Sequence, residues 1–118
     1  MNINEILEEA VKRGASDIFI IAGLPVTYKC KGMQERDQEE KLLPERIEEL
    51  VKEIYDISKR DLTNFNAGID DDFSFSISGL GRFRVNIFRQ RGSLAAVLRV
   101  IRFGLPDPDE LDAINGIG

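Results

Sequence analysis

The chain has 118 residues and a net charge of -5, and its 42% hydrophobic and 31% charged residues are typical of one globular domain and exclude an intrinsically disordered protein. It contains no histidine and a single cysteine, Cys30, which excludes Ser-His-Asp and Cys-His catalytic sites, the commonest zinc ligands and an internal disulfide. No apolar run approaches the roughly 18 residues that span a membrane, and the N-terminus lacks the features of a signal peptide, so we expect a cytoplasmic protein.

The first half of the chain alternates helix and strand patterns. Apolar residues recur with helical spacing from Ile3 onward, which predicts an amphipathic helix that ends at Gly14. Residues 18–21 and 26–31 have the patterns of two paired strands, and a further short strand is expected at 33–36. Pro44 marks the start of a second helix. Its predicted apolar face consists of Ile47, Leu50, Val51, Ile54 and Tyr55.

The second half begins with a predicted short helix. Ser58 with Asp61 three residues later resembles a capping box, so we expect this third helix to start there and to end near Gly68. The acidic run 70–72 leads into a half-buried strand over 73–78. Two more strands follow and form an antiparallel hairpin, with a turn at Gly92 and Ser93. The order of elements predicts an α+β domain with a mostly antiparallel sheet.

The hairpin concentrates positive charge on an otherwise acidic chain. Phe83, Val85 and Ile87 alternate with polar residues, which predicts one buried face and one polar face. The strand over 94–101 is apolar on both faces except at Arg99. No carboxylate interrupts the segment 82–102, so we expect a row of fixed cations on one part of the domain. Six arginines lie in this segment: Arg82, Arg84, Arg89, Arg91, Arg99 and Arg102.

The composition changes after Ile101. Gly104, Pro106 and Pro108 lie among acidic and small residues, which is typical of a linker. The 118 residues also contain no G-x-x-x-x-G-K-[ST] phosphate-binding loop. We therefore expect residues 104–118 to lead toward a second domain, and we expect the chain to lack enzymatic activity on its own.

Five segments together resemble a known family: G-A-S-D-I-F-I at 14–20, A-G-L-P at 22–25, D-F-S-F at 72–75, G-R-F-R-V-N at 81–86 and L-R-V-I at 98–101. Taken in this order, they are similar to the N-terminal domain of the PilT family of type IV pilus retraction (twitching motility) ATPases, within the secretion ATPase superfamily. The resemblance implies a PAS-like domain over 1–103 and a linker over 104–118 toward a RecA-type ATPase domain that these residues do not include.

The resemblance also implies partners and cofactors. The parent protein is expected to be a cytoplasmic homo-hexamer at the inner face of the membrane, where it works with an inner-membrane platform protein of the pilus. This domain would contact the RecA-type ATPase domain of the same or a neighbouring subunit. ATP and Mg are expected in the parent protein, whereas this domain alone is expected to bind no cofactor, no metal and no nucleic acid.

In this superfamily, arginines of the N-terminal domain reach the phosphates of the nucleotide. The resemblance carries this role over to Arg84 and Arg99, with Arg82 and Arg91 as weaker candidates, and it implies no catalytic residue in this chain alone. A guanidinium suits the role because it is planar, permanently charged and able to stabilise the charge that develops on a transferred phosphoryl group.

The residues by themselves leave other interpretations open. Arg82 and Arg84 also fit a solvated strand face or partners for the acidic run 70–72, and Arg99 also fits an internal salt bridge. We expect the acidic run itself to be a solvated strand start, because three consecutive carboxylates on a strand cannot face one ion. Arg89 and Arg102 are expected to have no ligand role.

Two alternative functions remain at this point. Basic residues interleaved with Phe83 and Phe88 resemble a stacking platform for single-stranded nucleic acid, although Phe83 falls opposite the arginines and the domain is acidic overall. A free-standing PAS-like ligand sensor is the other alternative, although no set of residues here points to a ligand.

Overall fold

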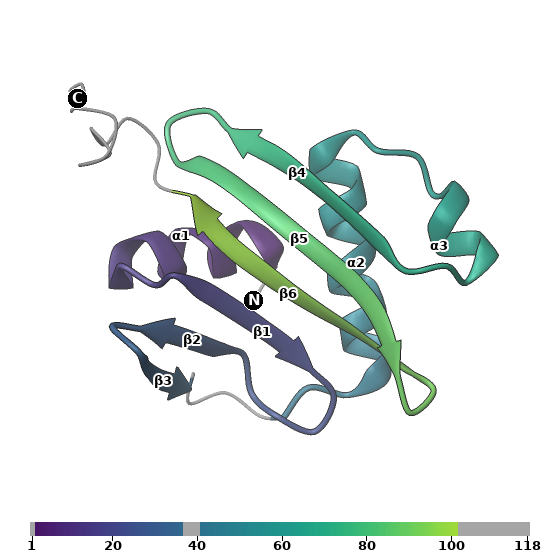
Figure 1. Ribbon diagram of the computed structural model, residues 1–118, viewed down its shortest axis with the longest axis horizontal. Helices are drawn as coiled ribbons and strands as arrows, with labels where there is room; N and C mark the ends of the chain where they lie inside the picture. Colours follow the sequence, from purple (N-terminus) through teal and green to yellow (C-terminus); the bar gives the residue numbers. More distant parts are fainter. Residues whose placement is uncertain (1, 37–40, 102–118) are drawn as a thin grey trace.

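A six-stranded sheet in which every neighbouring pair of strands is antiparallel forms the frame of the molecule (Figure 1). The computed structural model describes residues 2–36 and 41–101. The strand order is β3-β2-β1-β6-β5-β4, so the last strand of the described residues, β6, lies in the interior of the sheet. The predicted α+β class is therefore confirmed. The strands are β1 (Asp17–Ile21), β2 (Thr27–Cys30), β3 (Met33–Arg36), β4 (Asp71–Ile77), β5 (Gly81–Gln90) and β6 (Ser93–Ile101).

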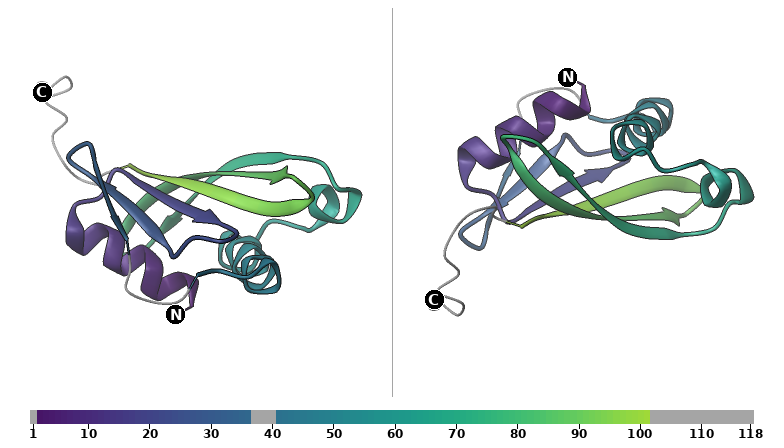
Figure 2. Two further views of the ribbon diagram at one scale, coloured as in Figure 1. Left: turned by 90° about the horizontal axis from the view of Figure 1, so that it is seen from below. Right: turned by 90° about the horizontal axis from the view of Figure 1, so that it is seen from above.

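Two amphipathic helices cover one face of this sheet, and no helix of residues 2–36 and 41–101 covers the other face, which we call the open face (Figure 2). Helix α1 (Ile3–Arg13) begins with a capping box: the Asn2 side chain accepts the backbone N–H of Glu5, and the Glu5 carboxylate accepts the backbone N–H of Asn2. The helix ends at Gly14, as predicted, because the left-handed φ of 71° there costs glycine little.

Helix α2 (Pro44–Ser58) supplies most of the remaining cover. All five residues of its predicted apolar face are buried. They pack with the inward residues of the central strands, where Phe83 and Leu98 have no exposed surface. Burial of this continuous apolar layer is the main term that favours folding. Within residues 2–36 and 41–101, no helix is both long and apolar enough to cross a bilayer.

The predicted start of the third helix is wrong. Ser58 is the last residue of α2, and its hydroxyl donates to the carbonyl oxygen of Tyr55. Lys59 then adopts a left-handed φ of 59° and ends that helix, so α3 (Thr63–Ala67) begins later. Asp61 accepts the backbone N–H of Thr63, a local turn that the spacing to Ser58 does not reveal.

The hairpin turn lies one residue earlier than predicted. Arg91 and Gly92 are its two central residues, with φ of 55° and 81°, while Gln90 pairs with Ser93. A two-residue hairpin turn of this type needs a positive φ at both positions, so Arg91 tolerates a conformation that favours glycine. The expected linker, residues 104–118, and Arg102 lie outside the described residues.

Candidate functional site

The strand register brings Arg84 and Arg99 together on the open face of the sheet. Arg84 on β5 pairs directly with Arg99 on β6, and the same row continues to Asp17 on β1. Side chains alternate between the two faces of a strand, so Phe83 on β5 points into the core instead. The two arginines to which the family resemblance assigns phosphate contacts are therefore cross-strand neighbours.

Two like charges directly opposite each other are unfavourable unless counterions lie nearby. Arg84 donates from Nε to Asp72 Oδ1 at 3.1 Å and from Nη2 to Asp72 Oδ2 at 3.3 Å. Arg99 donates from Nε to Asp17 Oδ1 at 3.4 Å. The hydrogen bond and charge of Asp72 raise the pKa of Arg84 above its ordinary value. The ion pairs that the sequence left open as alternatives are thus present at both arginines.

These ion pairs leave the guanidinium groups accessible. The side chains of Arg84 and Arg99 are 64% and 72% exposed, whereas that of Asp17 is only 12% exposed. Asp17 is also held by the Ser16 hydroxyl, which donates to its Oδ2 at 2.8 Å. A shallow depression lies between the two pairs, lined by Asp17, Asp72, Arg84, Asn86, Val97 and Arg99. A surface depression with two accessible guanidiniums is suited to an anion with several oxygens, such as a phosphate group.

The sequence of this chain is similar to the sequences of known proteins over most of its length. Over 101 residues it is 36% identical to the type IV pilus retraction ATPase PilT of Pseudomonas aeruginosa, and the match covers 86% of this chain and 29% of PilT. The chain is homologous to the N-terminal region of PilT. It is also 34% identical over 111 residues to the pilus ATPase PilU of the same organism, covering 94% of this chain and 28% of PilU. It therefore spans less than a third of either relative.

A solved structure of the pilus retraction motor PilT with bound ADP supports the same assignment. It matches with a TM-score of 0.73 at 36% identity, and the match covers 95% of this chain and 35% of that one. No protein-family model matches the chain. The PilT resemblance inferred from the five short segments is therefore confirmed across nearly the whole domain.

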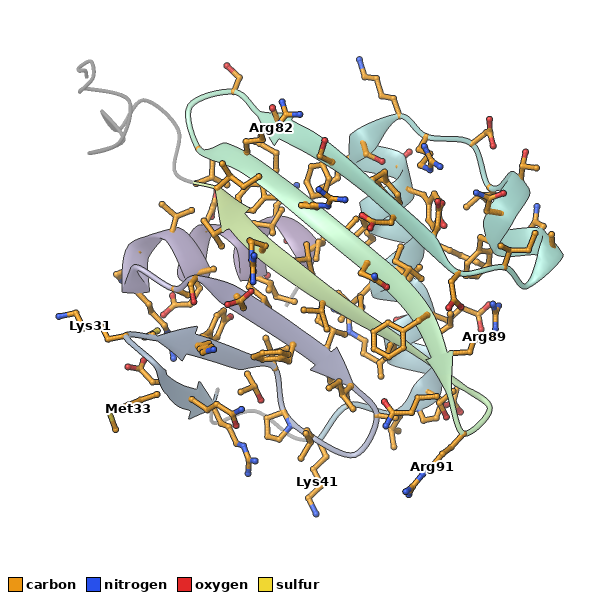
Figure 3. All side chains as sticks on the ribbon, viewed as in Figure 1. Lys31, Met33, Lys41, Arg82, Arg89 and Arg91 are labelled. Carbon is orange, nitrogen blue, oxygen red and sulfur yellow. The ribbon has the colours of Figure 1, made fainter. Side chains whose placement is uncertain are left out.

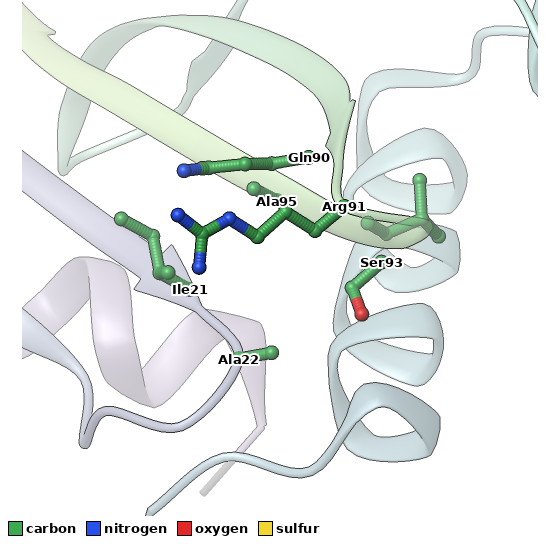
Figure 4. A pocket seen from close by; sticks show the side chains of 7 residues that line it. Ile21, Ala22, Gln90, Arg91, Ser93 and Ala95 are labelled. Carbon is green, nitrogen blue, oxygen red and sulfur yellow. The ribbon is translucent and has the colours of Figure 1, made fainter.

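The other two predicted arginines of this PilT-like domain lie in different places. Arg82 is on the same face as Arg84, and its Nη2 donates to Ser74 Oγ at 3.0 Å. Arg91 lies in the hairpin turn, at the other end of β5 from Arg82 (Figure 3). Arg91 is seven residues from Arg84 in the sequence, which corresponds to about 23 Å along a strand. Its side chain lines a separate small pocket together with Gln90 and Ile21 (Figure 4). Arg82 can join the Arg84 site, whereas Arg91 cannot.

Asp71 and Asp72, in the acidic run 70–72, have different structural roles. The prediction that this run is a solvated strand start is wrong for Asp71. Asp72 is exposed and pairs with Arg84. The Asp71 side chain is only 4% exposed and points to the opposite face, where it accepts two hydrogen bonds from Arg60 at 2.9 and 2.8 Å. It also accepts the Tyr55 hydroxyl at 2.8 Å and the Asn64 amide at 3.2 Å. Asp71 therefore joins α2, α3 and β4.

This network makes stability depend on pH. The Arg60 hydrogen bonds outweigh the effect of burial and lower the pKa of Asp71 from 3.8 to about 2. Burial, and after it the hydrogen bond to Asp71 and the charge of Asp71, raise the pKa of Tyr55. Because the folded-state pKa of Asp71 is depressed, its contribution is complete well above pH 3.8 and is lost as the pH falls toward 2.

We expect the stability difference between the wild type and Asp71→Asn to shrink by about 1 kcal/mol from pH 5 to pH 3, because the asparagine does not titrate. Urea denaturation of both proteins, followed by circular dichroism at each pH, measures this change. Asp72→Asn provides the control, because Asp72 lies on the exposed face. A difference that is constant or grows toward acid would contradict the proposed linkage.

Proposed function

We propose that this chain is the N-terminal domain of a type IV pilus retraction ATPase, in which Arg84 and Arg99 contact the phosphates of a nucleotide bound by an adjoining RecA-type domain. The homology to PilT supports the protein class. The single observation that carries the phosphate role is the accessible cross-strand pair of Arg84 and Arg99 on the open face. Two guanidiniums held at neighbouring positions stabilise the charge spread over the oxygens of a transferred phosphoryl group.

The proposal includes an assembly. Residues 1–103 form the PAS-like domain and residues 104–118 link it to the ATPase domain, which binds ATP and Mg. The open sheet face meets the ATPase domain of the same or a neighbouring subunit, and six copies form a ring in the cytoplasm beside an inner-membrane platform protein. In this arrangement the domain supplies charge and a contact surface, and it does not hydrolyse ATP by itself.

The purified 118-residue chain is expected to show no ATP hydrolysis above background, because it contains no phosphate-binding loop. A coupled phosphate-release assay measures this directly, with the Arg84→Ala variant as the control for contaminating enzymes. Turnover by the wild type that disappears in Arg84→Ala would overturn the proposal.

The gene provides a second test of the same proposal. The coding sequence downstream of Gly118 is expected to continue into a G-x-x-x-x-G-K-[ST] loop, which sequencing of the locus reveals. A stop codon at this point would contradict the linker and the motor function. Single-stranded nucleic acid is a weaker candidate. Of the two aromatic residues that suggested it, Phe83 has no exposed surface and cannot stack on a base, and Phe88 is only partly exposed.

A further inference from the structure

Asp17 and Asp72 hold their arginines in different ways. Asp17 contacts only Nε of Arg99, whereas Asp72 receives both Nε and Nη2 of Arg84. A two-point contact between a guanidinium and a carboxylate fixes the geometry of the pair and occupies one whole edge of the guanidinium. Among the described residues, Arg99 donates to a carboxylate only from Nε and lines the depression, while Arg84 already has an anion on one edge.

These four side chains form what we call the charge quartet: Asp17, Asp72, Arg84 and Arg99. Their formal charges sum to zero. A phosphate group that enters the depression meets two cations, but it also meets two carboxylates that already bind them. Among these carboxylates, Asp72 is the more exposed, at 46% compared with 12% for Asp17, and it belongs to the edge strand β4.

We propose that Asp72 acts as an internal competitor of the phosphate ligand and limits the affinity of the Arg84 site for polyphosphate. This inference rests on the proposed function of the site. Phosphate binding must either displace the Asp72 carboxylate from Arg84 or place a second anion beside it. Either event costs free energy, because the existing ion pair is lost or two negative charges approach each other.

The expected size of the effect follows from the exposure of the pair. Exposed ion pairs contribute little, so removal of the competitor is expected to tighten phosphate binding by about two- to fivefold. Asp72 is thus a positioning residue, which acts on the ligand through Arg84. It keeps Arg84 occupied until an anion of higher charge than a single carboxylate arrives.

Pyrophosphate titration of the 118-residue chain, followed by the NMR signals of the arginine Nε–H groups, tests this inference. Asp72→Asn is expected to bind pyrophosphate about two- to fivefold more tightly than the wild type. Asp70→Asn is the matched control, because it removes the same charge at an exposed residue just before β4. It is expected to change the affinity by less than about 1.5-fold, since screening weakens exposed charges that make no direct contact.

A double variant isolates the route through Arg84. In the Arg84→Ala background, the additional change Asp72→Asn is expected to give no further gain in affinity. Equal affinities for Asp72→Asn and Asp70→Asn would overturn the role of Asp72, as would an undiminished gain without Arg84. Thermal unfolding of each variant confirms that the fold is retained.

The outcomes separate the two proposals. If Arg84→Ala and Arg99→Ala weaken pyrophosphate binding but Asp72→Asn does not tighten it, only the competitor role fails. If neither arginine variant changes the affinity of a chain that binds pyrophosphate, the phosphate role of the site fails as well. If neither the wild type nor Asp72→Asn binds pyrophosphate, the competitor role fails, and ATPase assays of Arg84→Ala and Arg99→Ala in the protein that includes the ATPase domain decide the phosphate role.

Discussion

Replacement of Arg84 or Arg99 by alanine is expected to lower kcat for ATP hydrolysis by about 10³-fold or more in the protein that joins this domain to its ATPase domain. Arginines that contact a transferred phosphoryl group contribute roughly 10³- to 10⁵-fold to such reactions. The exposed positions of both side chains make a direct effect on folding small. Steady-state ATPase assays over a range of ATP concentrations separate the fall in kcat from any change in KM.

Two other arginines provide the controls. Arg36 lies on β3, at the edge of the sheet remote from β5, and Arg91 lies in the hairpin turn. Alanine at either position is expected to change kcat by less than about twofold, because neither side chain reaches the depression. A wild-type kcat in both Arg84→Ala and Arg99→Ala would contradict a role in phosphate charge stabilisation. A large loss in Arg91→Ala would place the site at the other end of the hairpin.

Asp71→Ala is expected to lower the free energy of unfolding by about 3 kcal/mol at pH 7. The substitution removes five hydrogen bonds that the Asp71 carboxylate accepts, one of them from the backbone N–H of Asp72. It leaves the Tyr55 hydroxyl and the Arg60 guanidinium without their common partner. Loss of one partner from a buried, hydrogen-bonded ion pair typically costs 3–5 kcal/mol, and the partial exposure of Arg60 favours the lower value. Urea denaturation followed by circular dichroism measures this loss.

The neighbouring carboxylates make this stability prediction specific. Asp70→Ala and Asp72→Ala remove the same charge at exposed positions, so each is expected to cost less than about 1 kcal/mol. Three equal losses would show that Asp71 has no special role, and the network with Tyr55 and Arg60 would then contribute little. A domain of this size has a total stability of roughly 5–15 kcal/mol, so Asp71→Ala is also expected to increase the sensitivity of the domain to proteases.

Periodicity allowed most of the fold to be predicted. Helical spacing identified the buried faces of α1 and α2, and alternation identified the outward position of Arg84 and the inward position of Phe83. The start of α3 was predicted wrongly because a capping box is recognised in a sequence only by the spacing of two residues, and Ser58 and Asp61 have this spacing. The actual boundary depends on a left-handed Lys59, and nothing in the sequence marks this residue.

The partners of the arginines depend on register, which short-range patterns do not contain. Asp17 and Arg99 are 82 residues apart in the chain and meet only because β1 and β6 pair in one register. Asp71 and Asp72 are adjacent and chemically identical, yet strand alternation sends one to the Tyr55 side and the other to Arg84. The acidic run itself was visible in the sequence, and applying the alternation to it would have separated the two residues.

The central position of β6 also affects how the domain forms during synthesis. This strand ends the described part of the chain, yet it pairs on one side with β1 and on the other with β5. Until residues 93–101 have left the ribosome, the nascent chain has β1 and β5 with unpaired edges, and its core lacks Leu98. Closure therefore requires a long-range pairing that forms only once residues 93–101 are available, so the sheet cannot be completed before nearly all of its described residues have been made.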